Sequence, residues 1–257
     1  MKLFSVINMD IVASRNIKNR ETIQEELIEY IKKLNIELKD ILATSITFTL
    51  GDEWQIVLKQ PSKSYYVVDR FQKFLKSKGI NIYAGIGIGT ISTSIYSDTR
   101  LMDGECFLIG REALNIAKEK NRFYSKQLNS TKNNIYFSAK NVSFLKPPVK
   151  VKKSSLLEEV AITTEQEENY NLSINKVINT LIENNEVLKS GITIKQLEII
   201  ELYEHFGSYN NIVKENPGLS KANISQKINA SNYFVINNNN LIIESMLDLY
   251  CNIRKGN

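Results

Sequence analysis

A short acidic turn lies between two runs of alternating apolar residues, and no other segment limits the fold as strongly. The apolar positions alternate with polar ones on both sides of the turn: Ile46, Phe48 and Leu50 before it, and Trp54, Ile56 and Leu58 after it. This alternation predicts a β-hairpin. Two adjacent carboxylates, Asp52 and Glu53, follow Gly51 at its tip. A solvated Gly-Asp turn is the alternative interpretation, because this pair is common in turns.

A third acid, Asp10, ends the first apolar run of the chain, residues 3–9. An acid at the end of one strand and acids at the tip of a neighbouring hairpin can together hold a divalent cation against a nucleotide phosphate. We therefore treat Asp10, Asp52 and Glu53 as candidate Mg²⁺ ligands. Alternatively, Asp10 only caps the chain where it leaves the strand.

The order of predicted elements in the first 144 residues indicates an α+β fold. Apolar residues at helical spacing follow Asn19 and again follow Pro61, whereas strict alternation over residues 80–88 predicts a strand. The first six elements then follow the βαββαβ order of ferredoxin-like folds, with one antiparallel sheet and its helices on one face. A third helix over residues 109–117 and a last strand over 135–138 complete this part.

Composition favours a cytoplasmic protein without a membrane span. The chain has 257 residues, is 42% hydrophobic and carries a formal charge of +5, which by itself does not indicate nucleic acid. No apolar run approaches the roughly 20 residues that a membrane helix needs. The two cysteines, Cys106 and Cys251, are far apart, so a zinc site or a disulfide framework is not expected.

A change in composition divides the chain into two predicted domains. Pro147 and Pro148 are followed by mixed runs of lysine and glutamate without clear periodicity, which is typical of a linker. The predicted limits are an α+β domain over residues 1–144, a linker over 145–171 and a helical domain over 172–257. Contact with phosphate is one interpretation of the basic residues in the linker, and a solvated connector is the preferred one.

The helical part contains a predicted helix-turn-helix. Thr193 and Gln196 have the spacing of a capping box at the start of one helix, which Gly207 ends. Further on, Ser220 is placed to cap a helix that buries Ile224 and Ile228. The residues then left for DNA in a major groove, or for its phosphates, are Ser220, Lys221, Asn223, Ser225, Gln226 and Lys227.

The function of this helical domain and the structure of its last residues each have two interpretations. Residues 190–257 contain equal numbers of basic and acidic residues, so DNA affinity would depend on a local patch and on a homodimer. A helical module that binds protein, or itself, is the other interpretation. Residues 234–236 and 241–243, on either side of an asparagine tract, predict either a wing hairpin or a closing helix.

Several short motifs resemble class III nucleotide cyclases, and Gly51-Asp52-Glu53 also resembles the hairpin of diguanylate cyclases. Asp10-Ile11, Leu50-Gly51-Asp52 and the glycine-rich strand 85–89 occur in the cyclase order. Alternatively, the glycines of that strand serve only to let a helix or the hairpin come close. The base-selecting Lys of cyclases falls at Phe48, and their transition-state Asn and Arg fall at Leu108 and Glu112. Ordinary cyclase activity is therefore not expected.

The whole chain resembles the bacterial SatD family more closely. The matching motifs, with the helix-turn-helix, are Asp10, Ser14-Arg15, Arg20, Gln24, Gly51-Asp52-Glu53, Asp103-Gly104 and Arg111-Glu112-Ala113. The resemblance to cyclases implies a nucleotide ligand with Mg²⁺, whose phosphates would meet Ser14, Arg15, Arg20 and Arg111. Alternatively, these arginines form only surface ion pairs.

The preferred hypothesis is a DNA-binding regulator with a nucleotide-binding, cyclase-like domain. A divergent nucleotidyl cyclase or another metal-dependent phosphoryl-transfer enzyme is the second hypothesis, and a non-catalytic interaction module is the third.

Overall fold

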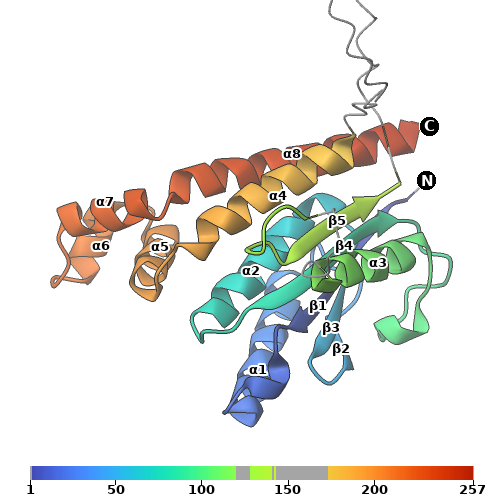
Figure 1. Cartoon of the computed structure of the whole chain (residues 1–257), viewed down its shortest axis with the longest axis horizontal. Coiled ribbons are helices and arrows are strands. Elements are labelled where there is room, and N and C mark those ends of the chain that lie inside the picture. Colours follow the sequence, from blue (N-terminus) through green and yellow to red (C-terminus); the bar gives the residue numbers. More distant parts are fainter. Residues whose placement is uncertain (1, 120–127, 141, 143–172, 257) are drawn as a thin grey trace, which may run out of the picture.

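Helices and strands make up most of the computed structural model, which describes residues 2–119, 128–140, 142 and 173–256 (Figure 1). The strands are β1 (Phe4–Ile11), β2 (Thr47–Leu50), β3 (Glu53–Leu58), β4 (Ile82–Gly89) and β5 (Ile135–Ala139). The helices are α1 (Arg20–Glu37), α2 (Ser64–Lys76), α3 (Glu105–Glu119), α4 (Ile174–Ser190), α5 (Ile194–Phe206), α6 (Tyr209–Glu215), α7 (Lys221–Ala230) and α8 (Tyr233–Gly256). The predicted α+β class is confirmed.

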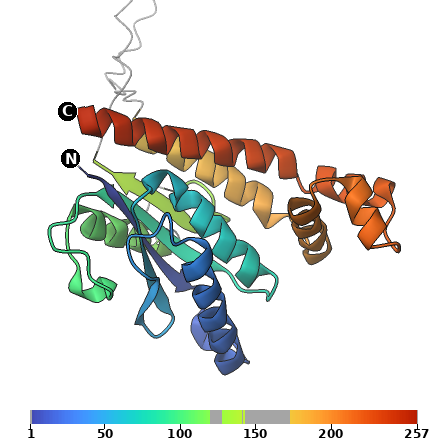
Figure 2. The same cartoon turned by 180° about the vertical axis from the view of Figure 1, so that it is seen from behind.

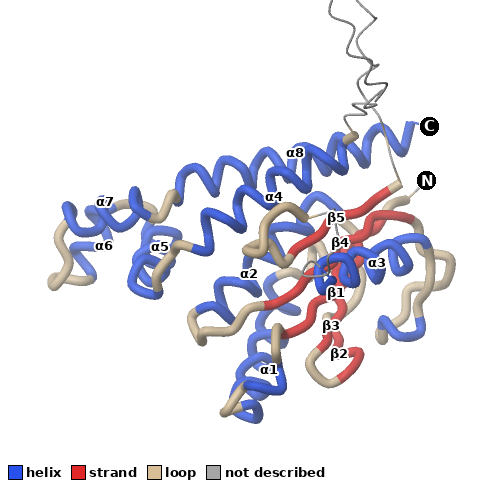
Figure 3. The backbone as a smooth tube through the Cα atoms, in the orientation of Figure 1, coloured by secondary structure: helices blue, strands red, loops and turns tan. Residues whose placement is uncertain are grey.

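The five strands form one sheet in the order β2-β3-β1-β4-β5 (Figure 3). The β2–β3, β3–β1 and β1–β4 pairs are antiparallel, and β5 joins β4 in parallel. β1 therefore lies at the centre, with the acidic hairpin on one side of it. The hairpin turns at Gly51, whose φ of 52° favours glycine.

Helices cover both faces of the sheet. Odd-numbered β1 residues such as Ile7 and Met9 face α1 and α2, whereas Phe4 and Val6 pack with Cys106 and Phe107 of α3. The sequence analysis placed the first two helices on one face, and α3 occupies the opposite one.

Glycines explain how α3 lies so close to the sheet. A Cβ atom built on Gly87 would lie 2.2 Å from the backbone nitrogen of Gly110, and one on Gly85 would lie 2.1 Å from that of Leu114. No side chain fits in this space, so these glycines allow a helix to approach the strand. Close approach of a helix was the alternative explanation that the sequence analysis gave for these glycines.

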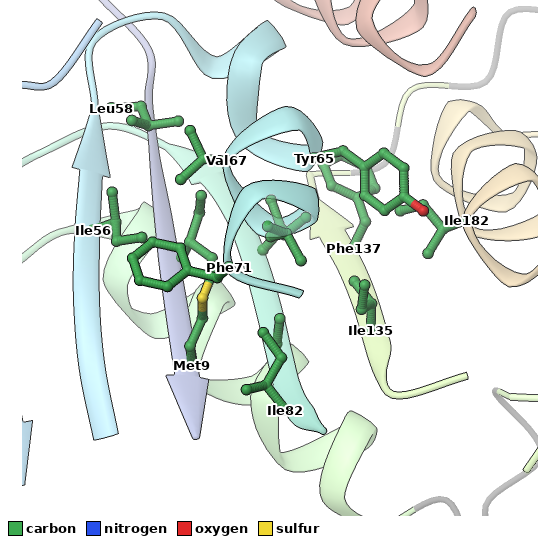
Figure 4. Packing of buried hydrophobic residues seen from close by; sticks show 14 of the residues in the cluster. Met9, Ile56, Leu58, Tyr65, Val67, Phe71, Ile82, Ile135, Phe137 and Ile182 are labelled. Atoms are coloured by element: carbon green, nitrogen blue, oxygen red, sulfur yellow. The ribbon is translucent and has the colours of Figure 1, made fainter. Parts of the chain in front are cut away.

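The largest hydrophobic core lies between the sheet, α1 and α2, and it continues into the C-terminal part of the chain. Figure 4 shows Phe71 of α2 over Met9 of β1, and Tyr65 of α2 near Ile182 of α4. Leu247 of α8 belongs to the same core. α4 and α8 thus pack on the sheet unit, which comprises β1–β5 with α1–α3. The predicted linker, residues 145–171, lies wholly outside the described residues, and the domain limits stay predictions.

The helices α5, α6 and α7 form a separate three-helix cluster at the end of α4 and α8, away from most of the sheet (Figure 2). Its own small core contains Ile199, Ile200, Ile212, Ile224 and Ile228. The predicted capping box at the start of α5 and the glycine at its end are confirmed, since Gly207 has a φ of 71°.

The wing hairpin considered for residues 234–243 is wrong. These residues belong to α8, the closing helix that was the alternative prediction. Ile236, Ile243, Leu247 and Tyr250 lie on one buried side of that helix. Their spacing follows the helical period, and it outweighs the turn preference of the asparagine tract. No helix in the described ranges has the length and apolarity that crossing a membrane requires.

Candidate functional site

Two of the three predicted metal ligands meet under α3. Asp10 on β1 lies opposite Glu53 on β3 in the antiparallel register. Directly opposed residues project from the same face of a sheet, here the face that α3 covers. Both side chains are largely buried, with 19% and 10% of their surface exposed.

Two cations from α3 neutralise this pair of acids. Lys118 Nζ lies 2.6 Å from Asp10 Oδ2 and 3.8 Å from Glu53 Oε2. Arg111 Nη1 lies 2.7 Å and 2.8 Å from the two carboxylate oxygens of Glu53. We call these four residues the charge cluster. Arg111 and Lys118 share one side of α3 because they are separated by seven residues, which is two helical turns.

A buried polar pair lies beside the charge cluster on the same face of the sheet. Gln55 Nε2 donates a hydrogen bond to Asn8 Oδ1 over 2.7 Å. Asn8 lies two residues before Asp10, and Gln55 lies two residues after Glu53. Since side chains in a strand return to the same face every two residues, this pair shares the face of the two acids. The Thr49 hydroxyl completes the surroundings by donating to Glu53 Oε1 at 3.1 Å. Thr49 and Arg111 together fix the orientation of the Glu53 carboxylate.

Asp52, the third predicted metal ligand, lies on the opposite side of the sheet. Arg20 Nη2 of α1 is 4.0 Å from Asp52 Oδ1, and Gln24 of α1 donates to the carbonyl of Gly51 at 3.4 Å. Arg20, Gln24 and Asp52 line a small cavity of about 20 Å³, and Ser14 lines it too. Arg15 is exposed in the short 3₁₀ turn before α1 and belongs to neither group of contacts.

The predicted ligand residues thus form two groups. Asp10, Glu53 and Arg111 lie on the α3 side, whereas Ser14, Arg20 and Asp52 lie on the α1 side. Asp52 belongs to the turn before β3 and contacts α1, whereas Glu53 is the first residue of β3 and faces α3.

The charge cluster offers at most two carboxylates to a metal ion. Among the residues that the structure describes, no three His, Cys, Asp or Glu side chains are grouped to hold one. Nucleotide-bound Mg²⁺ needs only one or two carboxylates, because phosphates and waters supply the other ligands. Asp10 and Glu53 meet that smaller requirement, but an ion between them would have to displace Lys118.

Lys118 is the member of the charge cluster that the sequence analysis missed. Its position seven residues after Arg111, on one helix face, was the signal available in the sequence.

Neither cysteine offers a nucleophile or a metal ligand. Burial raises the pKa of Cys106 to about 12 and that of Cys251 to about 11. Both thiols therefore stay protonated at neutral pH, whereas the thiolate is the reactive and metal-binding form.

The exposed side of α7 carries the other group of predicted site residues. Ser220 accepts a hydrogen bond from the backbone nitrogen of Asn223 and so caps the helix as predicted. Ile224 and Ile228 are fully buried and anchor α7 to the rest of the three-helix cluster. The α7 surface that remains consists of exposed Lys221, Asn223 and Gln226 with half-buried Ser225 and Lys227.

Comparison with protein families gives a match over residues 4–152, to the model of the SatD family. This range is more than half of the 257 residues. The chain belongs to the SatD family. The matched range includes all five strands and the whole charge cluster, whereas α4–α8 follow it. A search of curated proteins returned no match to this SatD-family chain.

Proposed function

We propose that this SatD-family protein is a DNA-binding regulator, and that the α7 surface is its DNA-reading element. The exposed and half-buried amide, ammonium and hydroxyl groups on one anchored helix are the observation that carries the proposal. Lys, Asn and Gln side chains supply the donors and acceptors that recognise base edges, and Ser can bind phosphate.

The charge of α7 supports this role. Residues 221–230 contain Lys221 and Lys227 and no acidic residue. Neither lysine forms an ion pair with any residue that the structure describes, so both ammonium groups remain available for phosphates. Neutralising phosphates releases counterions, which makes a favourable but salt-dependent contribution to binding.

The arrangement of α6 and α7 is that of a helix-turn-helix in this proposal. Five residues, 216–220, separate the two helices, and α7 is the second of them. In such proteins the N-terminal residues of the second helix enter the major groove. α7 lies at the far end of the molecule in both views, where the sheet unit does not block a duplex. A homodimer would present two such helices to two half-sites.

The second half of the proposal assigns a ligand to the sheet unit, which we interpret as a ferredoxin-like, cyclase-like domain. Its first four strands have the order β2-β3-β1-β4 with antiparallel neighbours, which supports that interpretation. We propose a nucleotide whose Mg²⁺ contacts Asp10 and Glu53. Arg111, 47% exposed, would then turn toward the phosphates, whereas Arg20 contacts the hairpin from the α1 side and Arg15 is exposed before α1.

Fluorescence anisotropy with labelled duplex DNA tests the DNA-binding half. Replacing Lys221 and Lys227 by alanine should weaken binding and reduce the slope of log affinity against log salt by about 2, since each phosphate contact contributes about 1. The matched control replaces Lys32 and Lys59, two exposed lysines of the sheet unit, and should leave the slope unchanged. Equal slopes for both double variants would refute the role of α7.

Calorimetry with each nucleoside triphosphate and Mg²⁺ tests the ligand half independently. Binding should be lost in Asp10→Asn and retained in Asp40→Asn, a matched change outside the charge cluster. Chromatography of the same mixtures distinguishes a ligand from a substrate. A product that disappears in Asp10→Asn would identify a phosphoryl-transfer enzyme instead of a sensor.

A further inference from the structure

A cavity of about 120 Å³ lies where the three-helix cluster meets the rest of the molecule. Its walls come from α2, α4, α5 and α8 and from the segments before β4 and β5. The cavity is therefore separate from the charge cluster, which lies under α3 on the opposite face of the sheet.

The acidic residues in the wall of this cavity already have cationic partners. Lys189 Nζ lies 2.6 Å from Asp69 and 3.3 Å from Glu186. Lys73 Nζ lies 3.2 Å from Asp69 and 2.7 Å from Glu204. Since Glu204 belongs to α5 and Lys73 to α2, this ion pair also joins the three-helix cluster to the sheet unit. The charged residues in the wall are three acids and four lysines, so its net formal charge is +1, which does not favour a cationic ligand.

Two lysines in the wall have no carboxylate partner among the residues that the structure describes. Lys76 Nζ donates to the backbone carbonyl of Lys189, and an ammonium group has three donors. Its partial burial lowers the pKa of Lys76, because removal from water disfavours the charged form. Lys132 is exposed at the wall of the same cavity. An anion beside Lys76 would relieve this electrostatic cost.

The remaining wall is apolar, with a few amide groups. Six aliphatic side chains contribute to it: Ile80, Ile82, Ile192, Leu197, Ile200 and Ile236. Asn237 and Asn240 of α8 add amide groups. Inorganic phosphate has no apolar surface to place against these side chains, whereas a small carboxylic acid has both an anionic and an apolar end.

We propose that this cavity binds a small monocarboxylate, with its carboxylate at Lys76 and its hydrocarbon part against the isoleucines. The volume limits the hydrocarbon part to roughly the size of benzene, which fills a cavity of about 150 Å³ in a well-studied case. This site is additional to the proposed nucleotide site and does not depend on DNA binding.

Calorimetric titration of the full chain with isovalerate tests the proposal. A ligand of this size should bind with a Kd of about 1 mM. The neutral analogue isovaleramide should bind about tenfold more weakly, because it lacks the charge that a lysine attracts. Inorganic phosphate should give no heat. Equal affinity for the acid and the amide, or no binding of the acid, would overturn the proposal.

Two variants locate the binding. Lys76→Met should weaken isovalerate binding about tenfold, whereas Lys59→Met should not change it, although Lys59 also donates to a backbone carbonyl. Asn237→Phe places an aromatic ring in the wall of the cavity and should abolish binding. Because Asn237 is exposed on α8, the variant should still fold, which a melting curve will verify. Unchanged binding in both Lys76→Met and Asn237→Phe would show that the acid binds elsewhere and would refute the site.

Discussion

Lys118 Nζ lies 2.6 Å from Asp10 Oδ2, so a cation from α3 already occupies the side of the carboxylate that a metal ion would use. Glu53 Oε2 is 3.8 Å from the same ammonium group. If Mg²⁺ enters with a nucleotide, it must compete with Lys118 for both acids. In the proposed complex, Lys118 would therefore weaken the binding of Mg²⁺ that arrives without phosphates.

Lys118→Gln should strengthen binding of Mg²⁺ with a nucleotide, because the competing ammonium is removed. A half-exposed ion pair contributes about 1 kcal/mol, so the expected gain is about fivefold. Calorimetry at fixed Mg²⁺ measures it, with Lys32→Gln as the control. Weaker binding in Lys118→Gln would mean that the lysine contacts the phosphates instead of excluding the metal.

The buried ion pair of Asp69 and Lys189 predicts a specific loss of stability in acid. Burial alone would raise the pKa of Asp69, but Lys189 and Lys73 outweigh it and hold this pKa at about 2, below the ordinary value of 3.8. A lowered folded-state pKa stabilises the protein above the unfolded-state pKa and ceases to do so as the pH falls through the folded-state pKa. The contribution of Asp69 is therefore complete above about pH 4 and disappears toward pH 2.

Urea unfolding at pH 5 and pH 2.5 measures this contribution. The free energy of unfolding should fall by on the order of 1–2 kcal/mol more in the native chain than in Asp69→Asn, which has no proton to gain at this position. Carboxylates that do not share Lys73 or Lys189 with Asp69 titrate equally in both proteins and cancel in the comparison. The same fall in both proteins would contradict the assignment of the ion pair.

The contact between β4 and α3 predicts a large effect from a single methyl group. Gly87→Ala would place its Cβ 2.2 Å from the nitrogen of Gly110 and 2.6 Å from the carbonyl oxygen of Cys106, so α3 must move away. We expect a loss of at least about 3 kcal/mol, at the upper end for overpacking, because both obstacles are backbone atoms. Gly191→Ala, whose nearest neighbour would lie 3.6 Å away, should change stability by less than about 1 kcal/mol. Chemical unfolding of the two variants gives the comparison.

The sequence predicted most of the regular elements because their signals are local. Strict alternation marked β4, and hydroxyl caps marked the starts of α5 and α7. The parallel addition of β5 and the shared core of α4, α8 and the sheet depend on contacts between distant segments, which no local pattern encodes. The asparagine tract led to the wrong prediction of a wing hairpin within α8. The spacing of Ile236, Ile243 and Leu247 indicated the helix correctly.

The candidate site was predicted only in part. Asp10 and Glu53 do meet as partners in the antiparallel register, whereas Asp52 belongs to the turn before β3, where the strand period does not set the direction of a side chain. No single motif predicts that Lys118 neutralises these acids, because Lys118 and Asp10 are 108 positions apart in the sequence.

Selection of DNA from a random duplex library by the full chain tests the central proposal most directly. The native protein should enrich a short motif, because Asn223 and Gln226 can each recognise a base edge, with adenine the preferred partner. A variant with both residues changed to alanine should still bind DNA through Lys221 and Lys227, but the enriched motif should lose its information at those positions. No enrichment by the native chain, or the same motif from the variant, would contradict the proposal that α7 reads DNA.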